Sequence, residues 1–340
     1  PSPTPTPTPQ TQTGNKLTWN GQPWNVTGVN VPWYRFGCDF GCGASGGVSS
    51  SQAIFSPAFQ RLRDAGVHFA RWWRFPGDTS LQITRDASGA PTGINPNVYT
   101  DIDAALQLAE QYDLYYNFVL FNDPTAIPRS WLENADHRAS LGQVLGPLFA
   151  RYANNPRVMS WEVFNEPEWR VRAGLITLPP IQETVRVVAQ SVHQNSNALV
   201  TVGAFRIDGI PNWTGLGLDY YSPHWYDGMT RPQECAICTD YASLQALYNL
   251  DKPVVIGEFC ADPGCTAGSP LTKFTELYNR GYAGAWGWSL FPDRTNDHLA
   301  IDFPALTTFT SSHSDIGPRA GVTPTSTPGP ISTPTPTPTP

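Results

Sequence analysis

Eight short apolar segments alternate with stretches of helical periodicity along most of the chain, and this alternation limits the fold more than any other feature. An apolar run of about four to eight residues between turn-forming residues is typical of a buried strand. The predicted strands are residues 26–31, 67–72, 114–121, 158–164, 198–203, 218–223, 253–257 and 283–289. The predicted helices are residues 58–65, 98–112, 141–152, 181–194, 241–249 and 271–279, and residues 36–51 are predicted to be a loop. This order favours an α/β fold of the (β/α)8 TIM-barrel type over an open doubly wound sheet.

The two ends of the chain are rich in proline, threonine and serine. Proline fixes φ and removes a hydrogen-bond donor, so residues 1–14 and 318–340 are predicted to be disordered, extended linkers without a core. We expect further modules to flank such linkers in the parent protein. The folded part is then a single domain over residues 15–317, which opens with a β-hairpin closed by Asn20-Gly21.

The charge pattern excludes several classes of partner. The formal net charge is −7, and the chain has no run of lysine or arginine. We therefore expect neither nucleic acid nor an anionic membrane surface as a partner. The sequence also lacks both a Gly-rich nucleotide-binding motif and an apolar run of the roughly 18 residues that would cross a membrane. We expect a monomer that needs no cofactor and no metal.

Six cysteines fall into three close pairs. Two of the spacings, Cys-x3-Cys and Cys-x4-Cys, fit a zinc knuckle poorly, so disulfides are favoured over a metal site or free thiols. The sequence does not fix the connectivity, and pairing within each couple is the simplest option. The couples are Cys38 with Cys42, Cys235 with Cys238, and Cys260 with Cys265. Together with the proline-rich linkers, disulfides predict a secreted, extracellular protein.

Two of the predicted strands end on a glutamate. The strand at 158–164 stops before Asn165 and Glu166, because Pro167 cannot donate a ladder hydrogen bond. The strand at 253–257 is followed directly by Glu258. In a (β/α)8 barrel the C-terminal strand ends meet at one mouth, so these carboxylates are expected to face each other. Two such carboxylates about 5–5.5 Å apart are what retaining glycoside hydrolysis requires.

Six motifs resemble those of the retaining (β/α)8 glycoside hydrolases, most nearly the cellulases and β-mannanases of family 5. The strand-4 and strand-7 glutamates are two of them, and the run Trp-Glu-Val-Phe-Asn-Glu-Pro at 161–167 is similar to a form common among the mannanases. The run at 66–71 resembles the family's strand-2 Gly-x-Asn-x-x-Arg, although His68 replaces the asparagine. The run at 224–226 resembles its His-x-Tyr, and the run at 285–288 resembles its strand-8 tryptophan motif.

The resemblance implies a role for each matching residue. Glu166 is the expected acid/base and needs a raised pKa, which burial and negative neighbours supply. Glu258 is the expected nucleophile, which Arg71 and Tyr226 hold in its charged form. Asn165 is expected to contact the sugar 2-OH, His224 to hydrogen-bond the acid or the sugar, and Trp288, rather than the core residue Trp286, to form the floor of the −1 subsite. The predicted substrate-binding residues are Arg71, Asn165, His224, Tyr226, Trp288, Trp33 and Asn122.

Other residues near the strand ends have a structural interpretation. Asn122 follows the third strand, where many family members have a histidine. Glu162 is predicted to be a buried, hydrogen-bonded glutamate of the barrel. We expect solvated loop charges at Glu168, Asp123, Asp227 and Glu234. Candidate sugar platforms, of which about half are expected to be core, are Trp33, Tyr34, Trp72, Trp73, Trp131, Trp169 and Trp225.

The leading hypothesis is a secreted, retaining endo-β-1,4-glycanase that acts on a β-linked plant polysaccharide, with mannan or glucomannan ahead of cellulose. The alternatives are an exo-acting β-mannosidase or β-glucosidase, or a transglycosylase. The disulfide loops after strands 6 and 7 are expected to narrow one end of the cleft, which favours attack at a chain end. A more remote alternative is an inactive, carbohydrate-binding barrel.

Overall fold

A computed structural model describes residues 14–19, 21–75, 82–292 and 298–317. The predicted linkers therefore lie outside the described residues, apart from Gly14, and so does Asn20 of the predicted hairpin turn. Eight parallel strands close into a barrel, which confirms the predicted fold. The strands in barrel order are β3 (Gly28–Val31), β4 (Phe69–Phe75), β7 (Tyr115–Phe121), β8 (Val158–Asn165), β9 (Leu199–Ala204), β10 (Ser222–Trp225), β11 (Val255–Cys260) and β12 (Gly284–Trp288).

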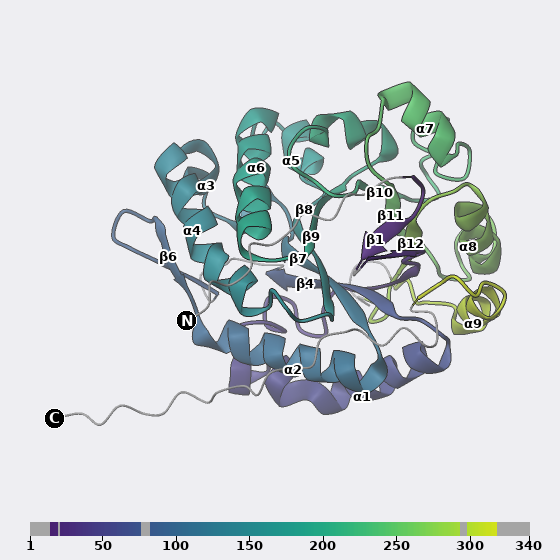
Figure 1. Cartoon of the computed structure of the whole chain (residues 1–340), viewed down its shortest axis with the longest axis horizontal. Coiled ribbons are helices and arrows are strands. Elements are labelled where there is room, and N and C mark those ends of the chain that lie inside the picture. Colours follow the sequence, from purple (N-terminus) through teal and green to yellow (C-terminus); the bar gives the residue numbers. More distant parts are fainter. Residues whose placement is uncertain (1–13, 20, 76–81, 293–297, 318–340) are drawn as a thin grey trace.

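Helices surround the barrel, as Figure 1 shows. They are α1 (Val48–Asp64), α2 (Pro96–Tyr112), α3 (Arg129–Glu133), α4 (Ala135–Arg151), α5 (Glu168–Arg172), α6 (Leu178–Asn195), α7 (Tyr241–Tyr248), α8 (Pro270–Asn279) and α9 (Phe303–Ser311). Local sequence explains the ends of α2: the Asn95 side chain accepts a hydrogen bond from Asn97 N, Pro96 occupies the first turn, and Asp113 takes the left-handed conformation at the end. The helices α3, α5 and α9 were not predicted, and neither was the first half of α1.

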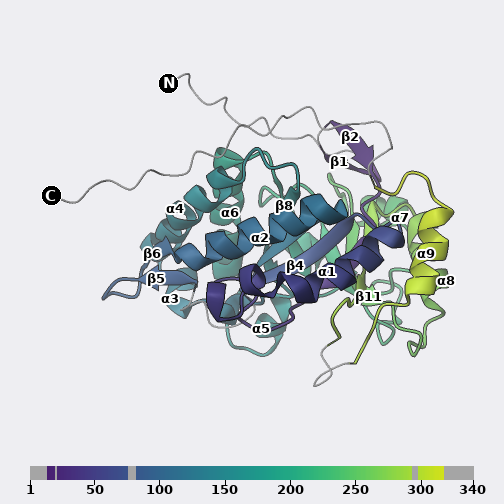
Figure 2. The ribbon, with the colours of Figure 1, turned by 90° about the horizontal axis from the view of Figure 1, so that it is seen from below.

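The N-terminal hairpin closes one end of the barrel. Strands β1 (Leu17–Trp19) and β2 (Gln22–Trp24) pair in antiparallel fashion, as predicted. Their apolar side chains pack in one cluster with Trp286 and with residues at or near the N-terminal ends of the barrel strands. Trp286 is thus a core residue, as predicted. In Figure 2 this hairpin and helix α5 lie at opposite sides of the molecule, so α5 belongs to the other end of the barrel.

Several predicted boundaries were wrong, including the start of α4 and the end of β11. Helix α1 starts at Val48, inside the segment predicted to be a loop, because Asp101 of α2 accepts hydrogen bonds from Ser49 N and Ser49 Oγ and so anchors its first turn. Strand β10 begins at Ser222 rather than at residue 218, and before it the Asp219 carboxylate accepts a hydrogen bond from Val200 N and contacts His193. A second hairpin, β5 (Ile83–Arg85) with β6 (Pro91–Ile94), was not predicted.

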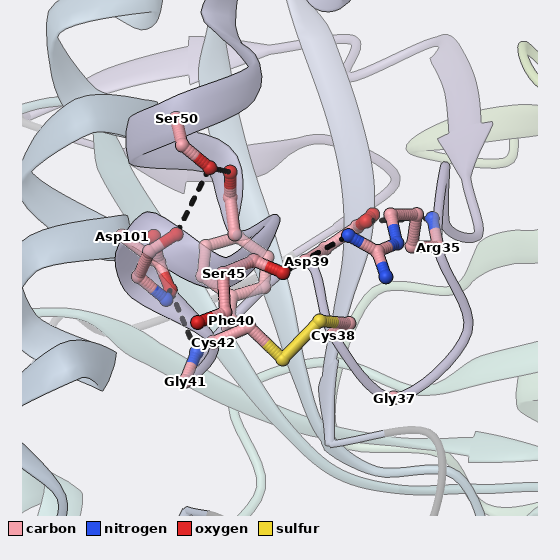
Figure 3. Close-up of a disulfide and its surroundings, with 12 residues drawn as sticks. Arg35, Gly37, Cys38, Asp39, Phe40, Gly41, Cys42, Ser45, Ser50 and Asp101 are labelled. Atoms are coloured by element: carbon pink, nitrogen blue, oxygen red, sulfur yellow. Dashed lines mark hydrogen bonds between the residues drawn. A yellow bond between two sulfur atoms is a disulfide. The ribbon is translucent and has the colours of Figure 1, made fainter.

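The six cysteines form three disulfides, each within one of the close pairs suggested by the sequence. Cys38–Cys42 lies after β3, Cys235–Cys238 after β10, and Cys260–Cys265 at the end of β11. Figure 3 shows the first of these beside Asp101, which accepts hydrogen bonds from the backbone of Gly41 and Gly43. Disulfide and buried carboxylate together fix the loop that follows β3. Within the described ranges, no helix has the length and apolarity to cross a membrane.

Candidate active site

Glu166 and Glu258 lie at the same mouth of the barrel. Glu166 directly follows β8, and Glu258 lies in the C-terminal half of β11. One carboxylate oxygen of Glu166, one ring nitrogen of His224 and one carboxylate oxygen of Glu258 lie within 4.8 Å of one another. The predicted pair of strand-end carboxylates is therefore brought together by the fold.

The backbone at Glu166 has an uncommon conformation. Its φ is +44°, in the left-handed region that non-glycine residues seldom adopt. The amide N of Glu166 donates to the carbonyl of Gly203 in β9 at 2.6 Å, which holds this turn against the neighbouring strand. A Cβ at Gly203 would lie 2.4 Å from Glu162 Oε1 and 2.9 Å from Arg71 Nη2, so glycine is needed for the close approach. Such strain is typical of functional sites.

Two donors contact the carboxylate of Glu258. Arg71 Nη1 donates to Oε1 at 2.6 Å, and the Tyr226 hydroxyl donates to Oε2 at 2.8 Å. Burial raises the pKa of Tyr226 well above its ordinary value, so the phenol keeps its proton. Burial raises the pKa of Glu258 above its ordinary value, and the charges of His224 and Arg71 and the Arg71 hydrogen bond oppose this rise. Both donors favour the ionised carboxylate that a nucleophile needs.

Arg71 is held in place by a second carboxylate. Its Nε donates to Glu162 Oε2 at 2.8 Å and its Nη2 donates to Glu162 Oε1, which makes a bidentate pair. Burial lowers the pKa of Arg71, yet the charges and hydrogen bonds of Glu162 and Glu258 raise it overall. Asn117 Nδ2 donates to Glu162 Oε2 at 2.8 Å, so the prediction of a buried, hydrogen-bonded Glu162 is confirmed. The arginine therefore reaches Glu258 with a fixed orientation.

Among the described residues, no cationic side chain is in hydrogen-bond contact with Glu166 at neutral pH. Its Oε1 lies 2.8 Å from His224 Nδ1, and its Oε2 accepts a hydrogen bond of 2.9 Å from the indole of Trp169. Burial lowers the pKa of His224 to about 4, so this imidazole is neutral near pH 7. Burial raises the pKa of Glu166 to about 7, with a further contribution from the charge of Glu162 and against the effects of Arg71 and Trp169. Glu166 can thus hold a proton at mildly acidic pH.

The remaining predicted binding residues have three different surroundings. Asn165 Oδ1 accepts a hydrogen bond of 2.7 Å from Arg71 Nη2, so this side chain belongs to the same network. Trp288 packs in a cluster with Trp73, and Trp33 and Tyr226 border this cluster. Asn122 hydrogen-bonds to its neighbour Asp123 and to Phe75, and among the described residues it makes no hydrogen bond to either carboxylate. A substrate contact by Asn122 therefore remains a prediction.

Several loop residues differ from expectation. The prediction that Glu168, Asp123 and Glu234 are solvated charges was wrong, because all three are buried. Asp123 pairs with Arg170, and Glu234 pairs with Arg206 and Arg231, whereas Asp227 pairs with the buried Lys273. Among the candidate platforms, Trp72, Trp73, Trp131 and Trp225 are buried, while Tyr34 and Trp169 are exposed.

Sequence reasoning missed the roles of Glu168 and Trp169 beside the acid. Glu168 Oε1 accepts a hydrogen bond from the Trp213 indole at 2.7 Å, and its Oε2 accepts one from Phe205 N at 3.0 Å. Burial raises the pKa of Glu168 to about 7. Both partners lie after β9, about forty residues along the chain, so no local pattern could have indicated them.

Two groups of described residues bring three potential metal ligands together. In the first, Glu166, His224 and Glu258, the carboxylate oxygens are already hydrogen-bonded within the site. In the second, Asp227 lies near Cys260 and Cys265, whose sulfurs are joined as a disulfide and are not thiolates. The contacts within both groups thus explain the arrangement without an ion, and we propose no metal at either place.

Comparison with known proteins gives consistent results. No family model matches the chain. A mannan endo-1,4-β-mannosidase from Mytilus edulis is 23% identical over 339 residues, with 84% of this chain and 89% of the relative covered. The solved β-mannanase of the blue mussel Mytilus edulis superposes with a TM-score of 0.73 at 21% identity, over 91% of this chain and 98% of that one. A family 5 glycoside hydrolase mannosidase from Rhizomucor miehei gives a TM-score of 0.56 at 14% identity, over 88% and 95%.

The closed barrel with two carboxylates brought together at its mouth is an arrangement that suits glycoside hydrolysis. The predicted resemblance to the family 5 type of enzyme, and to its β-mannanases, is confirmed by these relatives.

Proposed function

We propose that this chain is a retaining endo-β-1,4-mannanase with Glu258 as nucleophile and Glu166 as acid/base. The observation that carries the proposal is the approach of the two carboxylates, with oxygens within 4.8 Å of each other. Retaining glycosidases hold the two groups about 5–5.5 Å apart, whereas inverting enzymes need about 6.5–9.5 Å to admit a water molecule between acid and base. The spacing here favours direct attack by a carboxylate.

In the first step Glu258 attacks the anomeric carbon while the bond to the leaving oxygen breaks, and Glu166 donates its proton to that oxygen. Arg71 and Tyr226 keep Glu258 ionised up to that point. The ester that forms removes the negative charge of Glu258, so the pKa of Glu166 falls. Glu166 then accepts a proton from water, and the water oxygen attacks the anomeric carbon. This breaks the ester, frees the Glu258 carboxylate and releases the sugar with its original anomeric configuration.

The choice of mannan rests on the relatives. The Mytilus edulis protein is a mannan endo-1,4-β-mannosidase, and the superposed mussel structure is a β-mannanase. The sequence motif at 161–167 resembles the mannanase form as well. Three disulfides support an extracellular location, where mannan polysaccharide would be met. We also propose that further modules flank the domain of residues 15–317 in the parent protein, because the proline-rich segments beside it are typical of linkers.

A reducing-sugar assay tests the substrate. Purified protein is incubated with mannan, glucomannan, carboxymethylcellulose and xylan, and the products are separated over time. We expect the highest rate on mannan or glucomannan and a ladder of oligosaccharides from the earliest time points. Monosaccharide as the first product would show exo action, and a higher rate on cellulose or xylan would overturn the choice of mannan.

Matched variants test the mechanism. Glu258→Gln and Glu166→Gln keep the shape of each side chain but remove its charge and acid function, and each should lower the rate on mannan by at least about a thousandfold. Glu133→Gln is the control, because Glu133 is exposed at the end of α3 and, within the described part of the chain, pairs with Arg129 alone. Activity of Glu258→Gln within a few-fold of the control would sink the assignment.

A further inference from the structure

Trp169 contacts the proposed acid/base on the side away from the nucleophile. Glu166 Oε1 faces His224, whose Nδ1 also lies 3.5 Å from Glu258 Oε2. Glu166 Oε2 accepts the hydrogen bond from Trp169 Nε1 at 2.9 Å. Trp169 remains 49% exposed, which is unusual for a tryptophan. The N–H of an otherwise exposed ring is thus directed at the acid/base.

Neighbouring residues hold this ring in place. The ring centroids of Trp169 and Phe205 lie 4.3 Å apart, and the guanidinium of Arg172 lies 5.8 Å from the Trp169 ring. The backbone N of Trp169 donates to the Glu166 carbonyl at 3.2 Å. Glu168, next in the chain, binds Phe205 N and so fixes helix α5 to the segment after β9. These contacts hold the indole ring and thus the direction of its N–H.

The contact between the Trp169 indole and the Glu166 carboxyl group favours one protonation state of Glu166. An indole N–H is only a donor, so it binds an ionised carboxylate more strongly than a protonated carboxyl group. A glycosidase acid/base alternates between these two forms in every turnover. A donor on Oε2 stabilises the ionised form that accepts a proton from water, and it limits how far burial favours the protonated form.

We propose that Trp169 is a positioning residue that holds the Glu166 carboxylate in its ionised, base-competent form through its indole N–H. This inference rests on the proposed function, in which Glu166 is the acid/base. Other titratable and charged groups also face Glu166 from the strands and helix packed around it, and the test below leaves them unchanged. They are Arg71, Glu162, Glu168, His224, Tyr226 and Glu258.

The test is Trp169→Phe, which removes the N–H but keeps an aromatic ring against Phe205. The protein is labelled with carboxyl-¹³C glutamate, and the Glu166 resonance is assigned with Glu166→Gln and followed over pH. We expect the pKa of Glu166 to rise by about one unit, a tenfold change in its ionisation constant. The alkaline limb of kcat/KM on mannan should move to higher pH by the same amount.

Trp213→Phe is the matched control, because it removes an indole N–H from Glu168 Oε1 rather than from Glu166. It should shift the pKa of Glu166 by much less than Trp169→Phe does, since it acts only through the charge of Glu168. An unchanged Glu166 pKa in Trp169→Phe, or an equal shift in both variants, overturns the inference. The titration needs no turnover, so it remains valid if wild-type protein fails to hydrolyse mannan, which would refute only the proposed function. Thermal unfolding of each variant confirms that the measured protein is folded.

Discussion

Replacing Tyr226 with phenylalanine removes one of the two donors to Glu258 and leaves the other in place. The lost bond is the 2.8 Å contact from the phenol hydroxyl to Glu258 Oε2, while Arg71 still contacts Oε1. A hydrogen bond to a charged group contributes about 1.5–3 kcal/mol. Because one pKa unit corresponds to about 1.4 kcal/mol, the pKa of Glu258 should rise by about one to two units.

This shift has a defined effect on the pH profile. Glu258 must be ionised to attack, so the acid limb of kcat/KM reports its pKa. The limb should move to higher pH by about one to two units, which lowers the rate on the acid side of the profile by roughly tenfold or more. The alkaline limb, assigned to Glu166, should move much less. The pH range of high activity therefore becomes narrower on its acid side.

The assay is the initial rate on a mannan oligosaccharide between about pH 3 and pH 9. Tyr221→Phe is the control, because the Tyr221 hydroxyl donates to the Asp251 carboxylate at 2.7 Å near the start of β10, remote from the barrel mouth. It should leave both limbs in place. An unmoved acid limb in Tyr226→Phe, or the same movement in both variants, would refute the reasoning about Glu258.

Three further predictions follow from the same contacts. The wild-type rate should fall as pH rises through about 7, because Glu166 then loses the proton it must donate. Glu166→Ala should lack this alkaline limb of the pH profile. Added azide should restore turnover of Glu166→Ala and give the β-glycosyl azide. Glu162→Gln should lower the free energy of unfolding in urea by about 3 kcal/mol, since Arg71 loses its buried bidentate partner but keeps Glu258. Replacing Cys38 and Cys42 by serine should lower the free energy of unfolding by about 2 kcal/mol or less, because the disulfide closes a short loop, and thermal unfolding measures this.

The barrel and the two carboxylates could be predicted from the sequence for a simple reason. Strands that are buried on both faces are continuous apolar runs, and these remain visible in the sequence whatever the loops do. Glu166 and Glu258 stand directly at the ends of two such runs, so strand order alone placed them at one mouth. The pairing of Arg71 with Glu258 followed from the family resemblance and from the need for a counter-charge.

The surroundings of Glu166 could not be predicted in the same way. Helix α5 is five residues long and carries both Glu168 and Trp169, and its position depends on contacts with Phe205 and Trp213. These residues lie far along the chain, so the burial of Glu168 is a tertiary effect that the local pattern does not contain. The prediction for α1 began too late for a similar reason, because the first turn of this helix is anchored by Asp101 of another helix.

The central claim is that Glu258 forms a covalent bond to the sugar, and trapping that bond tests it most directly. The protein is incubated with a 2-deoxy-2-fluoro mannoside that carries a good leaving group, digested, and sequenced by mass spectrometry. The account predicts one sugar adduct, on the peptide that contains Glu258, and its loss in Glu258→Gln. An active enzyme that gives no adduct, or an adduct on Glu166 or elsewhere, would contradict it.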